Sequence, residues 1–230
     1  MGVYDLDQTI KDRHSTRKFL PLPVPREVIC ECLALAQCAP SNSNIQPWRM
    51  WLVTGSARHQ LKDKLMEVAR DGTPKVPDLP EHFKHFRQEL GAQVYGVGMG
   101  IPREDKEGRR AAVLRNWEFF GAPAVGIICV DKELGSPDVL GTGMYLQTLV
   151  LSLTARGLGT CVQVALAGYP DVMHEVLGIP RQMTILCGLS IGYPDPDFPV
   201  NQLRIGRNPV EHNVVFLEEL KIEKTGAKVE

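Results

Sequence analysis

The spacing of apolar residues along the chain predicts helices that alternate with short buried strands. Apolar positions that recur every three or four residues indicate helices, and these lie at residues 5–13, 27–38, 56–70, 104–120, 138–156 and 170–178. Short apolar runs that end at glycine or proline indicate strands, and these lie at residues 48–54, 124–130, 160–164 and 183–191. The alternation favours an α/β or α+β sandwich around one sheet. The helix at 138–156 is apolar on most faces, so we expect it to be central.

Residues 71–110 interrupt this order. Prolines and glycines break every periodic pattern in the stretch, and a segment of this length without regular structure is typically a lid, a binding loop or disordered. Its aromatic residues, which include Phe83, Phe86 and Tyr95, argue against disorder. We therefore expect a lid. The three rings suit stacking against a flat ligand, although ordinary packing within the lid explains them equally well.

The composition is that of an ordinary globular protein. The chain has 230 residues, of which 43% are hydrophobic and 23% charged, enough for one sizeable core. A formal net charge of −1 argues against a protein that wraps nucleic acid. No apolar run is long enough to span a membrane and no secretory signal is visible, so the cytoplasm is the expected location. The six cysteines are interpreted as free thiols, not as disulfides or metal ligands.

Candidate chemistry begins with the basic stretch Asp12–Phe19. Arg13 and Arg17 lie four residues apart, with Ser15 between them. Guanidinium groups and a short hydroxyl suit an anion with several oxygens, such as a phosphate. A solvated basic turn is the ordinary alternative.

A second stretch, Ala39–Trp48, is dense in small amides and hydroxyls between two prolines, so helix and strand are both disfavoured. Side-chain amides can pair with the polar edge of a heterocycle, and an ordinary loop explains the stretch as well. The common nucleotide motifs are absent. Gly157-Leu-Gly159 and Gly96-Val-Gly98 lack a third glycine at the correct spacing, and no Walker lysine loop occurs.

Three segments occur in an order and at a spacing that together are specific. Arg13-His14-Ser15-x-Arg17-x-Phe19 comes first, Ala39-Pro40-Ser41-x-x-Asn44-x-Gln46-Pro47-Trp48 precedes a strand, and Arg207-Asn208-Pro209-Val210-Glu211 lies near the C-terminus. They resemble the flavin-phosphate motif, the second motif and the C-terminal basic motif of the FMN-dependent nitroreductase family. The resemblance covers about residues 5–217. The lid resembles that of the nitrobenzoate-reductase-like and iodotyrosine-deiodinase-like branches, and we see no clear match to the deiodinase's zwitterion-binding residues.

The resemblance implies a single α+β domain over residues 1–230, built as a three-layer sandwich with a mixed central sheet flanked by helices. It also implies an intertwined homodimer. Residues 71–110 would be a lid insertion, and residues 195–230 would be a C-terminal arm over the partner subunit. Two FMN sites would lie at the dimer interface, each built from both subunits.

The resemblance further implies the residues of the site. The phosphate and nearby ring atoms would be held by Arg13, His14, Ser15, Arg17 and Arg207. Contacts from the partner chain would come from Pro40, Ser41, Asn42 and Asn44. The flavin ring would be met by Asn116 and by backbone groups of Ala165, Ala167 and Gly168. The substrate would be contacted by Phe83, Phe86, Tyr95 and Phe119. No metal site is expected.

Two departures from the family pattern concern the flavin ring. Ala167-Gly168 stands where many relatives carry Glu-Gly, and Phe119 stands where many carry lysine. A backbone amide survives the first change. The second change removes a positive charge near the ring and leaves the choice of substrate open.

The implied activity is reduction of a nitroaromatic or quinone-type acceptor by NADH or NADPH. In the expected ping-pong mechanism the nicotinamide passes a hydride to the flavin and leaves, and the acceptor then takes its place. Because the flavin carries the chemistry, no catalytic side chain is assigned, and His14 is interpreted as a flavin contact. The alternatives are a flavin-dependent reductive dehalogenase like the iodotyrosine deiodinases, a non-catalytic FMN-binding regulatory protein, and a binding module with a basic surface.

Overall fold

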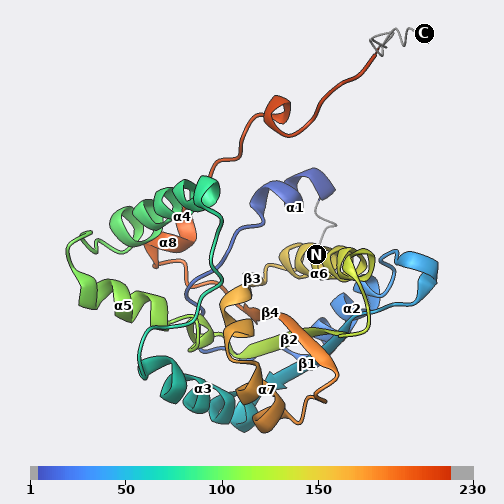
Figure 1. The fold of residues 1–230 in the computed structure, drawn as a ribbon, viewed down its shortest axis with the longest axis horizontal. Coiled ribbons are helices and arrows are strands. Elements are labelled where there is room, and N and C mark those ends of the chain that lie inside the picture. The colour runs from blue at the N-terminus through green and yellow to red at the C-terminus, as the bar shows by residue number, and fades with distance from the viewer. Residues whose placement is uncertain (1–4, 219–230) are drawn as a thin grey trace, which may run out of the picture.

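The structure, a computed structural model, describes residues 5–218 (Figure 1). The helices are α1 (Leu6–Asp12), α2 (Arg26–Ala36), α3 (Gly55–Arg70), α4 (Lys84–Gly91), α5 (Lys106–Leu114), α6 (Ser136–Thr154), α7 (Pro170–Leu177) and α8 (Pro199–Gln202). The strands are β1 (Arg49–Thr54), β2 (Ala124–Asp131), β3 (Gly159–Gln163) and β4 (Met183–Gly192). Every predicted helix and strand is present. The largest differences are a shorter α5 and additional helix in the lid.

The four strands form one sheet in the order β1-β2-β4-β3, and each neighbouring pair is antiparallel. Among the described residues, a parallel contact occurs at the isolated bridge that joins Ser15, outside the strands, to Thr160 of β3. The predicted α+β class is therefore confirmed, but the four described strands are not mixed in direction. Strand β2 is central and is buried along seven of its eight positions, because helices cover both faces of the sheet. That explains why it appears in the sequence as an unbroken apolar run.

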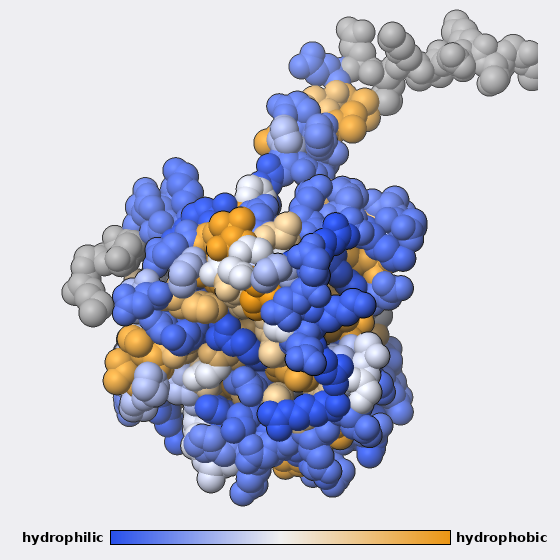
Figure 2. Space-filling view, turned by 90° about the vertical axis from the view of Figure 1, so that its left-hand side faces the viewer, coloured by the Kyte–Doolittle hydropathy of each residue, from blue (hydrophilic) through white to orange (hydrophobic). Residues whose placement is uncertain are grey.

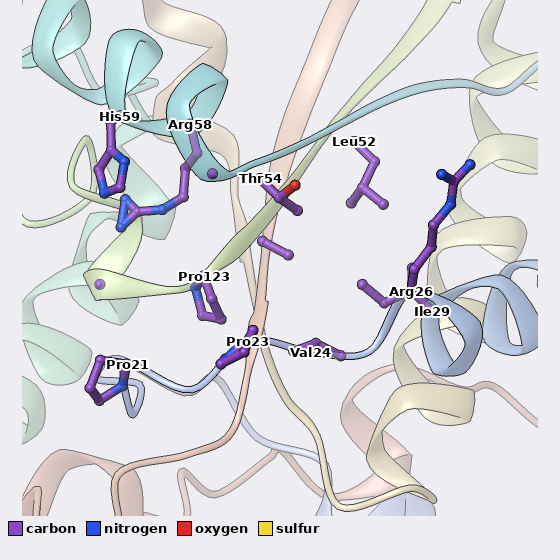
Figure 3. A pocket seen from close by; sticks show the side chains of 13 residues that line it. Pro21, Pro23, Val24, Arg26, Ile29, Leu52, Thr54, Arg58, His59 and Pro123 are labelled. Carbon is purple, nitrogen blue, oxygen red and sulfur yellow. The ribbon is translucent and has the colours of Figure 1, made fainter.

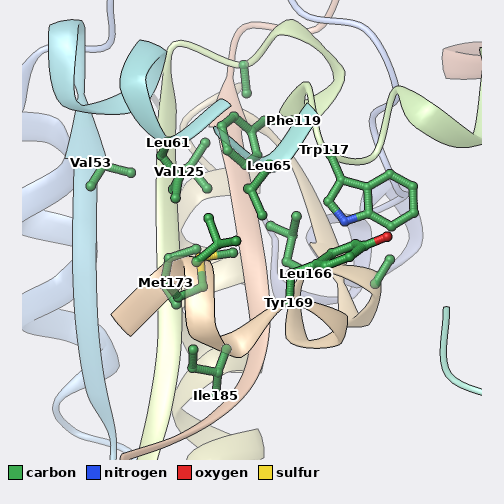
Figure 4. Packing of buried hydrophobic residues seen from close by; sticks show 14 of the residues in the cluster. Val53, Leu61, Leu65, Trp117, Phe119, Val125, Leu166, Tyr169, Met173 and Ile185 are labelled. Carbon is green, nitrogen blue, oxygen red and sulfur yellow. The ribbon is translucent and has the colours of Figure 1, made fainter. Parts of the chain in front are cut away.

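The sheet and the helices on its two faces form three layers, with one hydrophobic core on each face of the sheet. One core packs α3 and α7 against the sheet around the fully buried Trp117, Leu61 and Met173 (Figure 4). The other packs α2 and α6, where Trp48 stacks on Tyr145 with ring centroids 4.8 Å apart. The predicted central position of α6 holds for the side of the helix that faces the sheet. Its start is open, with Leu140 65% exposed.

The lid is more regular than the sequence indicates. A 3₁₀ turn at Glu81–Phe83, α4 and a π-helical turn at Ala92–Gly98 follow one another without a break. Of the glycines in this helical stretch, Gly98 is required by close packing. A Cβ on Gly98 would lie 2.7 Å from Val200 Cγ2, so the π-helical turn can pack directly on α8. The lid therefore rests on the segment from which the C-terminal arm begins.

The part of the predicted C-terminal arm that follows α8 leaves the body of the molecule (Figure 1). Its residues Val214–Leu217 are apolar but between 45% and 79% exposed, and Figure 2 shows hydrophobic side chains on this projecting part. Such a run of exposed apolar residues is typical of a segment that packs against another chain. Within residues 5–218, no helix is both long and apolar enough to cross a membrane.

Candidate functional site

A cleft of about 910 Å³ lies where the loop after α1, the lid helix α4 and the start of the C-terminal arm meet. Its basic side chains come from segments almost 200 residues apart in the sequence. We call it the basic cleft and define it by Arg13, His14, Ser15, Arg17, Arg204 and Arg207. Phe86 and Leu90 of α4 line it as well. The structure thus brings together all of the predicted phosphate contacts and one of the predicted aromatic substrate contacts.

The arginines of the basic cleft have no acidic partners within residues 5–218. The side-chain hydrogen bonds of Arg17, Arg204 and Arg207 within these residues go to backbone carbonyl oxygens. Arg17 donates to Ser15 O at 3.3 Å and Arg207 to Ile205 O at 2.7 Å. Burial lowers the pKa of the Arg13 guanidinium, and the nearby positive charge of Arg207 lowers it further. The cleft therefore concentrates unneutralised positive charge, which an anion with several oxygens would neutralise.

His14 presents an unused acceptor. Its Nδ1 lies 2.8 Å from Asp12 O, and because a carbonyl oxygen only accepts, Nδ1 carries the proton. Nε2 is buried and has no hydrogen-bond partner within the described residues. Burial lowers the pKa of His14, and the positive charges of Arg204, Arg13 and Arg17 lower it further against the opposing effect of the Asp12 hydrogen bond. A neutral imidazole of this kind suits a ligand hydroxyl that donates to Nε2.

The backbone of the basic stretch is attached to the sheet. Thr16 N–H donates to Thr160 O at 2.9 Å on the outer edge of β3. The approach is so close that a Cβ on Gly159 would lie 2.4 Å from Thr16 Oγ1. From another side, Arg115 donates to Arg17 O at 2.8 Å. The side chains of the cleft therefore project from a backbone that other elements hold in place.

Asn116 belongs to a buried polar network at the other end of the site. Gln163 Nε2 donates to Asn116 O at 2.8 Å, and Ser190 Oγ lies 2.6 Å from Gln163 Oε1 and 3.1 Å from Phe119 O. Gln163 is 3% exposed and Ser190 is fully buried. The network holds a strained turn, because Phe119 and Phe120 have φ of 57° and 55°, a region that bulky residues rarely adopt.

Phe119 corrects one prediction. Its side chain is fully buried in the core beside α3, so the ring does not face a substrate. The sequence pattern predicts a helix through residue 120. The positive φ of Phe119 instead points its side chain in another direction than the last turn of a helix would. Its backbone carbonyl is the part that faces the buried network, with its oxygen 3.1 Å from Ser190 Oγ.

The remaining ring contacts lie in the turn after β3. This turn, Val164–Gly168, includes Ala165, Ala167 and Gly168, of which Ala165 is buried. A Cβ on Gly168 would lie 2.8 Å from Lys75 O, so the first part of the lid crosses this turn at close range. Lys75 N–H also donates to Tyr169 Oη at 3.1 Å. The structure therefore places the lid directly against the predicted ring contacts.

The loop with Pro40, Ser41, Asn42 and Asn44 is not part of the basic cleft of the same chain. It packs against the start of α6, where Ser41 Cβ lies 3.4 Å from the position of a Cβ on Gly141. Its backbone is unusual, since Ser43, Asn44 and Gln46 all have φ between 47° and 56°. Clusters of strained residues are typical of ligand-binding segments. Contacts from this loop to a cofactor in a partner chain stay a prediction.

The aromatic residues of the lid differ in exposure. Phe83 and Phe86 are 46% and 43% exposed, and the rings of His82 and His85 pack against them in tilted arrangements at centroid distances of 4.2 and 4.0 Å. Tyr95 is half-buried in the π-helical turn, with the Arg109 guanidinium 5.7 Å from its ring centroid. Burial raises the pKa of Tyr95, although Arg17 and Arg109 oppose the change. Phe86 alone of the three predicted lid contacts lines the basic cleft.

Sequence reasoning missed several residues of the site. Arg204 joins the basic cleft, and its signal was the pair of arginines three residues apart in the C-terminal segment. Gln163 and Ser190 could have been found as polar residues inside strongly apolar strands, since buried polar side chains require partners.

Another cavity, of about 800 Å³, lies away from the basic cleft along β1 (Figure 3). Leu52 and Thr54 of β1 line it together with Pro23 and Arg58. Arg58 Nη1 is buried without a hydrogen-bond partner within residues 5–218, and burial lowers the pKa of this guanidinium. None of the predicted site residues lines this cavity.

Comparisons with known proteins agree on one family. Residues 10–193 match the nitroreductase family model. The chain is 34% identical to a 4-nitrobenzoate reductase of Nocardioides sp. (strain LMS-CY) over 94% of this chain and 91% of that one. It is 35% identical to a 4-nitrobenzoate reductase of Pseudomonas putida over 93% and 96%. The solved structure of the FMN-dependent nitroreductase NfnB from Mycobacterium smegmatis in complex with NADPH matches with a TM-score of 0.85 and 31% identity, covering 93% of this chain and all of that one.

The environment of His14 predicts a pH dependence of stability. Because its pKa is lowered in the folded chain, its contribution to the free energy of unfolding is complete above the unfolded pKa of about 6.5 and is lost as the pH falls through the folded pKa. The cofactor-free His14→Gln variant should therefore lose less stability than the wild type between about pH 7.5 and pH 5.5, as measured by urea unfolding in phosphate-free buffer. His59→Gln, at an exposed position, is the matched control for the loss of an imidazole. Equal slopes for His14→Gln and the wild type would contradict the assignment.

Proposed function

The chain belongs to the nitroreductase family, and on that premise we propose that it is an FMN-dependent oxidoreductase that reduces nitroaromatic or quinone-type acceptors with NADH or NADPH. The observation that carries the proposal is the basic cleft. Four arginines without acidic partners within the described residues converge there beside a neutral histidine with a free acceptor. This donor set fits the phosphate and the hydroxyl-bearing chain of FMN.

The residues divide into a phosphate end and a ring end. Arg13, Ser15, Arg17 and Arg207 would hold the phosphate, with Arg204 as an additional cation. His14 Nε2 would accept from a hydroxyl of the ribityl chain. Asn116 and backbone groups of the turn Val164–Gly168 would meet the ring. When bound, FMN supplies the two-electron chemistry between the nicotinamide and the acceptor.

The chain's own contribution is binding and orientation. The lid carries Phe83 and Phe86 in exposed positions, where they are available to stack on an aromatic acceptor. Tyr95 lies deeper, near Arg17 and Arg109. No side chain is assigned as a nucleophile or general base. The relatives named as 4-nitrobenzoate reductases favour a nitroaromatic over a halotyrosine as the acceptor class.

We also propose that two copies of the chain form the working dimer, as a single domain each. Within residues 5–218, β1 pairs on one side only, with β2, and a free strand edge is a template for another strand. The exposed apolar residues Val214–Leu217 are suited to pair with the free edge of β1 in the partner and to enter the cavity beside it. Glu218, which follows them directly, would then offer a carboxylate to Arg58, whose Nη1 has no partner in the described chain.

The oxidoreductase proposal is tested by the absorbance of the purified protein. We expect a flavin spectrum that bleaches on anaerobic addition of NADH or NADPH and returns when a nitroaromatic such as 4-nitrobenzoate is added. Deiodination of a halotyrosine in place of nitro reduction would favour the dehalogenase alternative. Flavin that no nicotinamide reduces would favour the regulatory protein. A protein that stays colourless after incubation with FMN would overturn the proposal.

Arg17→Ala should lower the affinity for FMN roughly 10–100-fold, because it removes a charge-assisted contact to the phosphate. The loss of activity should follow the loss of flavin and be reversed by excess FMN. Arg181→Ala removes a remote arginine that is 68% exposed, and it should leave FMN binding unchanged. Full flavin occupancy with lost turnover in Arg17→Ala would show that the phosphate assignment is wrong.

The dimer proposal is tested by placing a charge in the arm. Val215→Asp should raise the dimer dissociation constant at least about tenfold, as measured by sedimentation, because a carboxylate cannot enter an apolar interface. The matched control is Val97→Asp, since Val97 and Val215 are 77% and 79% exposed but Val97 lies in the lid. A wild type that sediments as a monomer, or equal effects of the two variants, would contradict the proposed docking.

A further inference from the structure

Asn201 makes three hydrogen bonds through one buried side chain. It lies on α8 and is 3% exposed. Its Oδ1 accepts from Arg17 N–H at 2.8 Å, and its Nδ2 donates to Lys18 O at 2.8 Å and to Asp195 O at 2.9 Å. Two carbonyl oxygens and one N–H surround the amide, so only one orientation of the side chain satisfies all of them. The Asn201 side chain thus holds the backbone of Arg17 and Lys18 against the segment that leads into α8.

The surrounding contacts fasten the same two segments together. Asp195 N–H donates to Lys18 O at 3.0 Å, and Leu20 N–H donates to Tyr193 O at 2.9 Å. The Lys18 ammonium lies 2.9 Å from Asp195 Oδ2. The segment after the basic stretch therefore runs along the segment that leads into α8, although 184 positions separate Arg17 from Asn201 in the sequence.

Asn201 also reaches the second basic segment. Its own carbonyl oxygen accepts from Arg204 Nη1 at 3.1 Å. Arg204 and Arg207 follow it within six residues, and both line the basic cleft. One residue therefore contacts the backbone from which Arg17 projects and the side chain of Arg204, so the separation between the two groups of cations depends on it.

We propose that Asn201 is a positioning residue for the phosphate end of the flavin and gives the chain its preference for FMN over riboflavin. The inference rests on the proposed FMN site. Like charges repel, so the arginines would separate without a rigid connection. By fixing Arg17 relative to Arg204 and Arg207, Asn201 holds them at the spacing that a single phosphate bridges. The flavin ring and ribityl chain, which riboflavin shares with FMN, are met by other residues.

A purely structural role predicts a different result. If Asn201 only stabilised the fold, its loss would weaken FMN and riboflavin binding by the same factor. A role at the phosphate end weakens FMN alone. The ratio of the two affinities is therefore the measurement that separates the two roles, and riboflavin binding reports at the same time that the variant is folded.

The experiment titrates the cofactor-free full chain with FMN and with riboflavin, following flavin fluorescence. For Asn201→Ala we expect the FMN dissociation constant to rise at least about tenfold, while that of riboflavin changes less than about twofold. Ser190→Ala removes a buried hydroxyl at the ring end and should weaken both ligands alike. Ser152→Ala removes a buried hydroxyl on α6 that contacts Arg156 and should change neither.

A double-mutant cycle gives a second test. Since Asn201 acts through Arg17, Asn201→Ala should have less effect on FMN affinity in an Arg17→Ala background than in the wild type. If Asn201→Ala does not fold, Asn201→Ser takes its place, and the same direction of change is expected. An unchanged ratio of FMN to riboflavin affinity, or independent effects in the cycle, overturns the inference. A wild type that does not prefer FMN to riboflavin overturns the proposed FMN site itself.

Discussion

The site depends on bringing several positive charges together without partners. Arg13, Arg17, Arg204 and Arg207 share one cleft, and within residues 5–218 none of them forms an ion pair. Such an arrangement repels itself, and partial burial increases the cost of each charge. Hydrogen bonds to the backbone hold the arrangement instead. Thr160 and Asn201 fix the basic stretch from two sides, so the cleft is preorganised for an anion that no group within residues 5–218 supplies.

Among the described non-glycine residues, positive φ occurs in two segments, the loop after α2 and the turn before β2. Phe119, Phe120, Ser43, Asn44 and Gln46 are the described non-glycine residues with positive φ. Each such residue costs about 1–3 kcal/mol. Burial of Phe119 and Phe120 in the core stabilises the turn that they form, and Ser190, which lies 3.1 Å from Phe119 O, packs the same turn against β4. The ring end of the site is therefore tied directly to the packing of the main core.

Local patterns in the sequence were sufficient for the elements and for half of the site. The unbroken apolar run of β2 and the compact motif around Arg13 and Arg17 carry their signal within a few residues. The partners of Asn201 and Ser190 could not be predicted in the same way, because they lie 184 and 71 positions away. The helical lid was missed for a related reason. Gly98 looks like a helix breaker until α8 is seen to need the space where its Cβ would lie.

A single chain offers only part of the predicted flavin environment. The loop around Ser41 and Asn44 packs at the start of α6 and does not line the basic cleft, while the apolar arm projects from the body with no core to cover it. Both features are explained when a second copy covers the arm and brings its own loop to the cleft. Cofactor binding and dimer formation would then share contacts, and by linkage each must strengthen the other. In the proposed dimer the partner would cover the exposed apolar arm, while the phosphate of the cofactor would neutralise the positive cleft.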